Sequence, residues 1–251
     1  MTTTRIILCG CHGHMGKVIT SICEKRDDIK IVAGVDFQSA PASYPVYKYV
    51  TEVKEDTDVV IDFSHPSALP SLLQYSKSKC GVPLVLCTTG YSQSEVESLK
   101  EASKEIPVFY SRNMSLGINL LIELAKKAAA VLGDSFDVEI IEKHHNLKID
   151  APSGTALMIA DAVAGVLPGD NTYMYDRHSQ RKRRDKSEIG IHAVRGGTIV
   201  GEHEIIFAGN HETVSISHSA QSKDLFANGA VNAAIYMNGK KAGLYDMSAL
   251  I

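Results

Sequence analysis

The residues best suited to chemistry lie in one short stretch in the second half of the chain. His144 and His145 are adjacent, Lys148 follows closely, and Ser-Gly-Thr occupies positions 153–155. Ser, Gly and Thr at the start of a predicted helix leave backbone N–H groups available to an anion, and imidazole and ammonium groups beside it can move protons. Two loop histidines and a surface lysine are the structural alternative, which fits the histidine pair alone better than the whole cluster. The stretch predicts a pocket for a small carboxylate that is protonated during a reaction.

A glycine-rich turn near the start of the chain is suited to a nucleotide. Gly10, Gly13 and Gly16 stand between a predicted strand and a predicted helix, and Asp36 closes the next predicted strand. Glycines allow a tight turn and let backbone N–H groups approach a pyrophosphate, and an acid at the end of the second strand accepts hydrogen bonds from ribose hydroxyls. The alternative is a structural glycine turn. The strand, turn, helix and acid together favour a dinucleotide.

The residues that follow Asp36 bear on the choice of nucleotide. Phe37 and Gln38 come next, so no basic residue stands immediately after the acid. A 2′-phosphate is usually met by Arg or Lys in that neighbourhood. The sequence therefore predicts that NADH is used at least as well as NADPH.

Thiol and imidazole groups around the glycine turn raise the question of a metal. Cys9, Cys11, His12 and His14 all lie there. Their spacing matches neither a zinc finger nor a facial triad, and the nucleotide interpretation explains their position. We expect no metal.

Alternating strands and helices must position the glycine turn, and the pattern changes after residue 115. The first part predicts strands at 5–10, 29–35, 59–63, 83–87 and 107–110 with helices at 15–25, 67–78 and 92–104. The second predicts helices at 120–132, 155–166 and 226–237 with strands at 136–142, 190–195, 198–207 and 213–219. We expect a Rossmann-type α/β domain (1–115 and 226–251), with the last helix packing on the first, and an α+β domain (116–225) with a mixed or antiparallel sheet.

Composition excludes several classes of protein. The chain has 251 residues, a net charge of −3 and 44% apolar residues, which argues against a nucleic-acid or anionic-membrane binder. The basic run Arg181–Lys186 is predicted to be a solvated loop, with a nucleic-acid patch or a cationic loop near an anionic substrate as the alternatives. An odd number of cysteines without a Cys-x-x-Cys pair indicates a reducing compartment, and no apolar run is long enough to span a bilayer. We expect a cytoplasmic protein.

Several motifs together resemble the 4-hydroxy-tetrahydrodipicolinate reductase family, also called dihydrodipicolinate reductases. The most specific is the run from His144 to Ala156, His-His-x-x-Lys-x-Asp-Ala-Pro-Ser-Gly-Thr-Ala. The others are the segments 10–16, 60–64, 88–91, 113–119, 194–197, 201–204 and 226–231. The resemblance covers essentially the whole chain.

The resemblance implies a role for individual residues. His144 is similar to the catalytic histidine and Lys148 to the catalytic lysine, and the residues alone leave open which is the proton donor. His145, Gly154 and Thr155 look like substrate ligands. The cofactor residues would be Gly10, Cys11, His12, Gly13, His14 and Met15 at the pyrophosphate, Asp36 at the ribose, and Cys87, Thr88, Thr89, Ser111, Arg112, Asn113 and Met114 on the nicotinamide side.

The resemblance also implies a reaction and an assembly. The reaction is hydride transfer from NADH or NADPH to a cyclic dicarboxylate, in lysine and diaminopimelate biosynthesis. The assembly is a homotetramer built through the sheet of the second domain. The main alternative is a non-catalytic NAD-binding sensor on the same fold. An aspartate-semialdehyde dehydrogenase would need a nucleophilic cysteine, which no segment convincingly offers.

Overall fold

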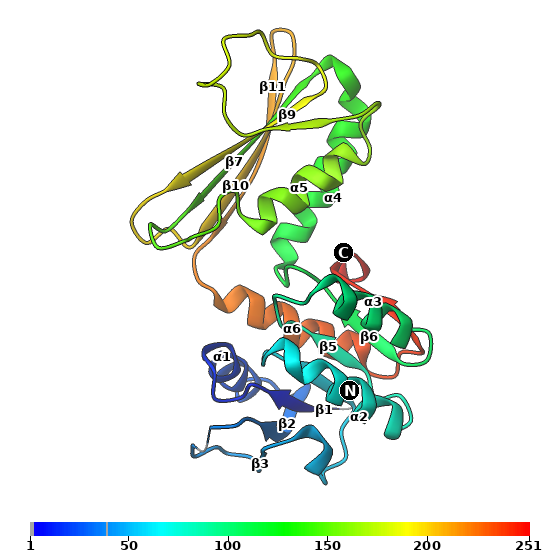
Figure 1. Cartoon of the computed structure of the whole chain (residues 1–251). Helices are drawn as coiled ribbons and strands as arrows, with labels where there is room; N and C mark the ends of the chain where they lie inside the picture. The colour runs from blue at the N-terminus through cyan, green and yellow to red at the C-terminus, as the bar shows by residue number, and fades with distance from the viewer. Residues whose placement is uncertain (1–2, 39) are drawn as a thin grey trace. The chain divides into compact units, whose positions relative to one another are not determined.

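The computed structural model describes residues 3–38 and 40–251, and the chain divides into two compact units (Figure 1). The first unit comprises Met1–Leu116 and Asp224–Ile251, and the second comprises Gly117–Lys223. The first unit is therefore built from both ends of the chain. Among the described residues no helix is both long and apolar enough to cross a membrane.

The first unit is a parallel sheet with helices on both faces. The strand order is β12-β6-β5-β4-β1-β2-β3, so the chain begins at the centre, moves to one side through β2 and then crosses to β4. The strands are β1 (Thr4–Cys9), β2 (Ile29–Val35), β3 (Val46–Tyr47), β4 (Val59–Asp62), β5 (Leu84–Leu86), β6 (Pro107–Tyr110) and β12 (Gly243–Tyr245). The reversal beside β1 creates the crevice in which such sheets bind ligands at the carboxyl ends of their strands.

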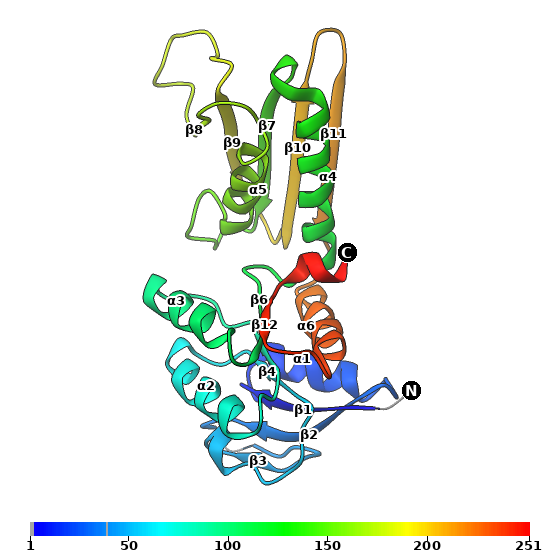
Figure 2. The ribbon, with the colours of Figure 1, turned by 90° about the vertical axis from the view of Figure 1, so that its right-hand side faces the viewer.

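Strand β1 shows how the two faces are filled. Its side chains alternate between the faces, so Ile6 and Leu8 pack on one core while Ile7 and Cys9 pack on the other. Helices α1 (His14–Cys23) and α6 (Asp224–Met237) cover the first face, and α2 (Leu69–Ser78) and α3 (Gln93–Ala102) cover the second (Figure 2). Because both faces are covered, the strands are nearly continuous apolar runs.

Helix α6 packs against α1, which confirms the expected return of the last helix. Its buried side is made of small residues, including Ala227, Ala230 and Ala234. A Cβ placed on Gly229 would lie 1.7 Å from the carbonyl oxygen of Met114. Only glycine fits there, so the helix approaches the chain leaving β6 at backbone distance.

The second unit is a five-stranded mixed sheet with helices on one face. The order is β11-β10-β7-β9-β8; β7, β9 and β8 are mutually parallel, and β10 is antiparallel to both β7 and β11. The strands are β7 (Asp137–His144), β8 (Thr172–Met174), β9 (Glu188–Arg195), β10 (Gly201–Ala208) and β11 (Thr213–Ala220), and the helices are α4 (Leu116–Leu132) and α5 (Gly154–Ala164). Val138 and Ile140 of β7 point into the core under these helices. The expected fold class, a Rossmann-type α/β part with a second mixed sheet, is confirmed.

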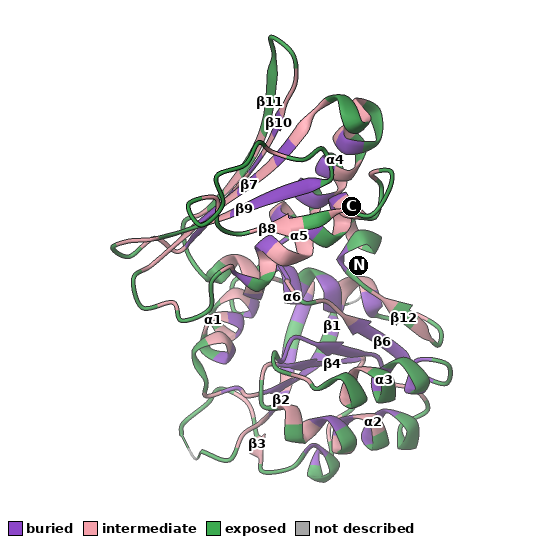
Figure 3. Cartoon of the chain, turned by 45° about the horizontal axis from the view of Figure 1, so that its top comes forward, coloured by how far each residue is buried: buried purple, intermediate pink, exposed green. Residues whose placement is uncertain are grey.

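The differences from the predicted elements lie at edges and ends. Strands β3, β8 and β12 were not predicted, because two or three residues carry too little periodicity. Helix α4 begins at Leu116 rather than 120, and β10 begins at Gly201 rather than 198. Short 3₁₀ turns occur at Val50–Glu52, Pro66–Ala68, Gly133–Ser135 and Met247–Leu250. The buried residues follow the strands, for example β4, β6 and β9, whereas the outer turns of α2 and α3 are exposed (Figure 3).

Candidate active site

The glycine turn between β1 and α1 forms a cradle that side chains would fill. Gly10 has a φ of +76°, and a Cβ there would lie 2.4 Å from the carbonyl oxygen of Phe63. A Cβ on Gly16 would lie 2.3 Å from the carbonyl oxygen of Gly10. Gly13 caps α1 without a side-chain hydrogen bond, so no cap side chain covers the first-turn N–H groups. The turn therefore presents the positive end of α1 in the way a pyrophosphate requires.

Asp36 is tied to this turn by hydrogen bonds. The backbone N–H of His12 donates to Oδ2 of Asp36 at 3.0 Å, and the N–H of Gln38 donates to Oδ1 at 2.9 Å. Each carboxylate oxygen keeps a second lone pair for a ribose hydroxyl. Nε2 of His12 is buried and has no hydrogen-bond partner among the described residues. The acid, the cradle and this unpaired nitrogen fit an adenosine pyrophosphate.

The two segments predicted on the nicotinamide side line one cavity. Thr88 and Thr89 follow β5, Ser111 and Arg112 follow β6, and all four belong to its wall. These positions are the carboxyl ends of neighbouring parallel strands, where a Rossmann fold places the reactive end of its cofactor.

Not every predicted cofactor residue can offer its side chain. Cys11, Cys87 and Met114 are buried in the core beneath α1 and α6, so only their backbones are available to a ligand. Burial raises the pKa of Cys11 to about 11, and it also raises the pKa of Cys87. Met15 packs against the same core, whereas His14 is exposed. Asn113 accepts a hydrogen bond from the N–H of Ser115 at 2.8 Å and shapes the turn before α4.

A buried acid at the end of β4 was missed by the sequence reasoning. Asp62 is fully buried and accepts hydrogen bonds from Oγ of Ser64, Oγ1 of Thr88 at 2.7 Å and the hydroxyl of Tyr91 at 3.4 Å. Burial raises the pKa of Asp62, and these donors oppose the shift. Asp62 therefore links β4 to the loop after β5. Its position at the end of a buried strand was the available signal.

In the second unit, a buried glutamate holds His144. Glu142 has 0% exposure and lies two residues before His144 on β7, so both side chains leave the same face of the strand. Nδ1 of His144 donates to Oε2 of Glu142 at 2.6 Å. Arg195 of β9 donates to both oxygens of Glu142 at 2.8 and 2.7 Å, and the N–H of Ser153 donates at 3.0 Å. Neither Glu142 nor Arg195 was predicted as a site residue.

This arrangement fixes the protonation of both groups. Burial acts to raise the pKa of Glu142, but hydrogen bonds from Arg195 and His144 outweigh it and keep that pKa below its usual value. Burial lowers the pKa of His144 against the opposing effect of Glu142. An ionised Glu142 places the His144 proton on Nδ1, which leaves Nε2 as the working atom. A Cβ on Gly201 would lie 3.0 Å from Nε2, so glycine leaves room beside that nitrogen.

Ser153 connects a second histidine, His203, to the start of α5. Its Oγ accepts from the N–H of Ala156 at 3.1 Å as the helix cap and lies 3.2 Å from Nε2 of His203. The His203 ring meets the His144 ring edge-on, with centroids 5.3 Å apart. Burial lowers the pKa of His203 to about 4, so this imidazole is neutral at physiological pH.

The start of α5 already holds a carboxylate. Nζ of Lys148 donates to Oδ1 of Asp150 at 2.7 Å, and this bond is the largest cause of the lowered pKa of Asp150. The N–H of Gly154 lowers the same pKa. A Cβ on Gly154 would meet nothing within 4 Å, so the helix start faces open space. Lys148 and the predicted substrate ligand Gly154 therefore both contact the carboxylate of Asp150. In the adjoining turn, the N–H of Lys148 donates to the carbonyl oxygen of His145. Thr155 is the next residue of α5.

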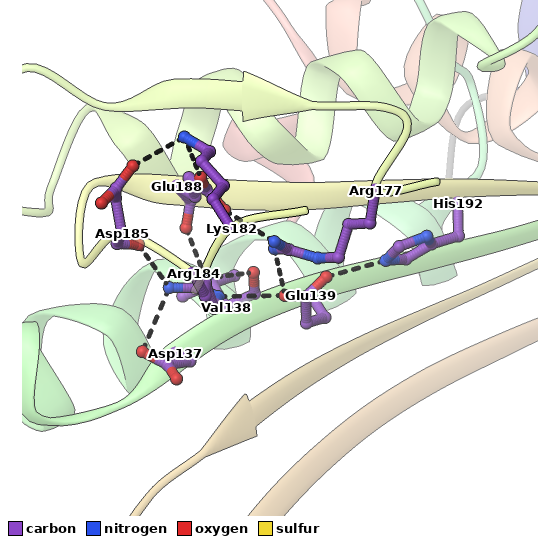
Figure 4. Close-up of polar contacts among 9 residues, drawn as sticks. All are labelled: Asp137, Val138, Glu139, Arg177, Lys182, Arg184, Asp185, Glu188 and His192. Carbon is purple, nitrogen blue, oxygen red and sulfur yellow. Dashed lines mark hydrogen bonds and ion pairs between the residues drawn. The ribbon is translucent and has the colours of Figure 1, made fainter. Parts of the chain in front are cut away.

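The basic run Arg181–Lys186 lies in the loop between β8 and β9, but Arg184 is not solvated. Figure 4 shows side chains from this loop reaching carboxylates on β7 and β9. Arg184 pairs with Asp137 at 3.1 Å and Glu139 at 3.0 Å, and Lys182 pairs with Glu188 at 3.1 Å. The prediction of a solvated loop agrees with the exposure of the other five residues of the run; Arg184 alone is half-buried, because carboxylates of β7 attract it.

These features place the chain among the two-domain oxidoreductases that use a pyridine nucleotide. Comparison with known sequences gives the family. Residues 4–114 match "Dihydrodipicolinate reductase, N-terminus" and residues 117–251 match "Dihydrodipicolinate reductase, C-terminus". The chain belongs to the 4-hydroxy-tetrahydrodipicolinate reductase family, and the resemblance drawn from its motifs is confirmed.

Relatives match over nearly the full length. The 4-hydroxy-tetrahydrodipicolinate reductase of Caldanaerobacter subterraneus subsp. tengcongensis is 54% identical over 247 residues, covering 98% of both chains. That of Clostridium novyi is 49% identical over 249 residues, covering 99% of this chain and 98% of the other. The fold matches a dipicolinate-bound dihydrodipicolinate reductase from Paenisporosarcina sp. TG-14, with a TM-score of 0.82, 24% identity and full coverage of both chains.

Proposed function

We propose that this chain reduces 4-hydroxy-tetrahydrodipicolinate (dihydrodipicolinate) to tetrahydrodipicolinate in lysine and diaminopimelate biosynthesis. The observation that supports this most is the set Glu142, His144 and Lys148 beside the start of α5. A sensor that only bound NAD would need the cradle and Asp36 but not this set. The family is that of oxidoreductases with this activity.

The first unit binds the cofactor in this proposal. The cradle at residues 10–15 takes the pyrophosphate, Asp36 takes the ribose, and the segments 87–89 and 111–114 flank the nicotinamide. When bound, the reduced nicotinamide supplies the hydride. Because Asp36 accepts hydroxyl hydrogen bonds and repels a 2′-phosphate, NADH serves at least as well as NADPH.

The second unit binds the substrate. A substrate carboxylate takes the place that Asp150 holds beside Lys148 and the N–H of Gly154. His145 and Thr155 complete the contacts to the two carboxylates. Fixing both carboxylates orients the acceptor carbon, which lowers the entropic part of the barrier.

Lys148 and His144 divide the proton chemistry. A lysine ammonium carries a proton at neutral pH, whereas burial favours the neutral form of His144. We assign Lys148 as the direct proton donor and Nε2 of His144 as a polar contact held in place by Glu142. Lys148→Ala should lower kcat/KM by about 100-fold or more, because it removes both a charge contact and the donor.

Oxidation of the reduced nicotinamide tests this function. The purified protein is mixed with NADH or NADPH, and substrate is made in situ from pyruvate and aspartate semialdehyde by the preceding synthase. Synthase-dependent loss of nicotinamide absorbance is expected with the wild type and with the exposed control Lys127→Ala, but not with Lys148→Ala. A protein that binds NADH and oxidises none would be the sensor instead.

The assembly and location complete the proposal. We propose a cytoplasmic homotetramer formed through the sheet of the second unit. Helices α4 and α5 cover only one face of that sheet (Figure 1). Ile141 and Ile206 point to the other face, because their strand neighbours Ile140 and Ile205 belong to the core under the helices.

A further inference from the structure

An exposed aromatic side chain stands beside the ribose-binding acid. Phe37 directly follows Asp36 and is 75% exposed. Its ring meets the Tyr49 ring edge-on, with centroids 5.8 Å apart and an angle of 84°. The exposed face of this ring, at the carboxyl end of β2, is available for stacking with a flat ligand.

Strand β3 brings a lysine to the same place. It pairs in parallel with β2, with Val35 opposite Tyr47, and the N–H of Asp36 donates to the carbonyl oxygen of Tyr47 at 3.0 Å. Lys48 therefore leaves the sheet next to Asp36. The sequence could not indicate this, because β3 is two residues long and Lys48 lies 12 positions after Asp36.

Aromatic rings hold Lys48 without cancelling its charge. Its Nζ lies 6.0 Å from the centroid of the Phe37 ring and 5.6 Å from that of the Tyr49 ring. Within the part of the chain that the structure describes, no carboxylate forms an ion pair with Lys48. Cation–π contacts orient an ammonium but leave its full positive charge available to an anion.

We propose that Lys48 binds the 2′-phosphate of NADPH, and that the exposed face of Phe37 stacks on the adenine. Lys48 supplies from β3 the basic group that is missing after Asp36. Asp36 still favours the free hydroxyls of NADH, and Lys48 offsets its repulsion of the phosphate. The site consequently accepts both nucleotides. This inference rests on the proposed cofactor site of the first unit.

Binding of nucleotide fragments tests the inference without catalysis. Calorimetry compares adenosine 2′,5′-bisphosphate with 5′-AMP, which differ only by the 2′-phosphate. Lys48→Gln should weaken binding of the bisphosphate by about 5- to 20-fold at low salt and leave AMP unchanged, because an exposed charge contact is modest and screened. Lys48→Arg should restore binding, and the exposed control Lys54→Gln should bind both fragments as the wild type does.

Steady-state kinetics give a second readout. Lys48→Gln should raise KM for NADPH with kcat unchanged, and leave both constants for NADH unchanged, because the contact lies far from the nicotinamide. Phe37→Ala should weaken the binding of both the bisphosphate and AMP, since both carry the adenine, while Tyr49 still contacts Lys48.

Three outcomes would overturn the inference. If Lys48→Gln lost affinity equally for the bisphosphate and for AMP, the substitution would have a general effect on the site. If it lost no affinity for the bisphosphate, Lys48 would not reach the 2′-phosphate. If the wild type bound neither fragment, the proposed cofactor site would fail together with this inference. If the fragments bind as expected and no substrate is reduced, only the proposed reaction fails.

Discussion

Glu142 shows how one buried carboxylate organises a site. It receives hydrogen bonds from Arg195, His144 and the backbone of Ser153, which belong to two neighbouring strands and the start of a helix. A buried charge with so many donors stays ionised and keeps its partners in one orientation. His144 thereby presents a single nitrogen, and the loop leading to α5 is fixed at its end.

The buried histidines predict a loss of stability in acid. Burial lowers the pKa of His203 from 6.5 to about 4. Above pH 6.5 His203 is neutral in both the folded and the unfolded state. Between pH 6.5 and 4 the unfolded state binds a proton at this residue and the folded state does not. Stability should therefore fall as the pH drops from 6.5 towards 4, by up to about 2 kcal/mol near pH 5 from His203 alone.

Urea unfolding at neutral pH and near pH 5 measures this effect. His203→Asn should show a smaller difference between the two pH values than the wild type. Any packing defect of the variant is present at both pH values and cancels in the difference. An unchanged pH dependence would mean that His203 is protonated in the folded state.

At the scale of elements, Asp62 connects the end of β4 to the loop after β5. Asp62→Asn keeps the shape but replaces an acceptor oxygen with a donor facing Ser64 or Thr88. We expect about a tenfold weaker affinity for NADH, since the nicotinamide-side loop loses its anchor, and unchanged affinity for ADP-ribose, which lacks the nicotinamide. Calorimetry with both ligands measures the split. Equal losses for the two would assign Asp62 to general stability instead.

The elements also show which parts of the site were predictable from sequence. The cradle, Asp36 and the run from His144 to Thr155 are local patterns in which turn chemistry and function coincide. Glu142, Asp62 and Lys48 were missed because each has a partner that is distant in sequence. Glu142 on β7 contacts Arg195 on the neighbouring strand β9, Asp62 contacts Thr88 after β5, and Lys48 after β3 contacts Phe37 after β2. The long helices and central strands were predicted because periodicity marks them, whereas β3, β8 and β12 depend on pairing with a neighbour.

For the whole molecule, the sheet face opposite α4 and α5 predicts the assembly. Ile206→Asp places a charge on the face opposite α4 and α5, where burial in an oligomer would cost about 2 kcal/mol or more per subunit. Sedimentation equilibrium should show a tetramer for the wild type and smaller species for the variant. Val131→Asp on the exposed side of α4 is the matched control and should remain tetrameric. A monomeric wild type, or a tetrameric Ile206→Asp, would contradict the proposed interface.

Because α6 and β12 belong to the first unit, their position at the end of the chain also determines the order in which the two units can complete folding during translation. The second unit is one continuous segment and has all its strands once residue 223 has left the ribosome. Helix α1 covers only part of one face of the sheet in the first unit, and this cover is completed when α6, which is translated last among the α-helices, packs on α1. Synthesis of the nucleotide-binding unit therefore begins first and ends last, and until α6 is made the apolar side chains of Ile6, Leu8 and Ile19 lack the contacts that α6 supplies.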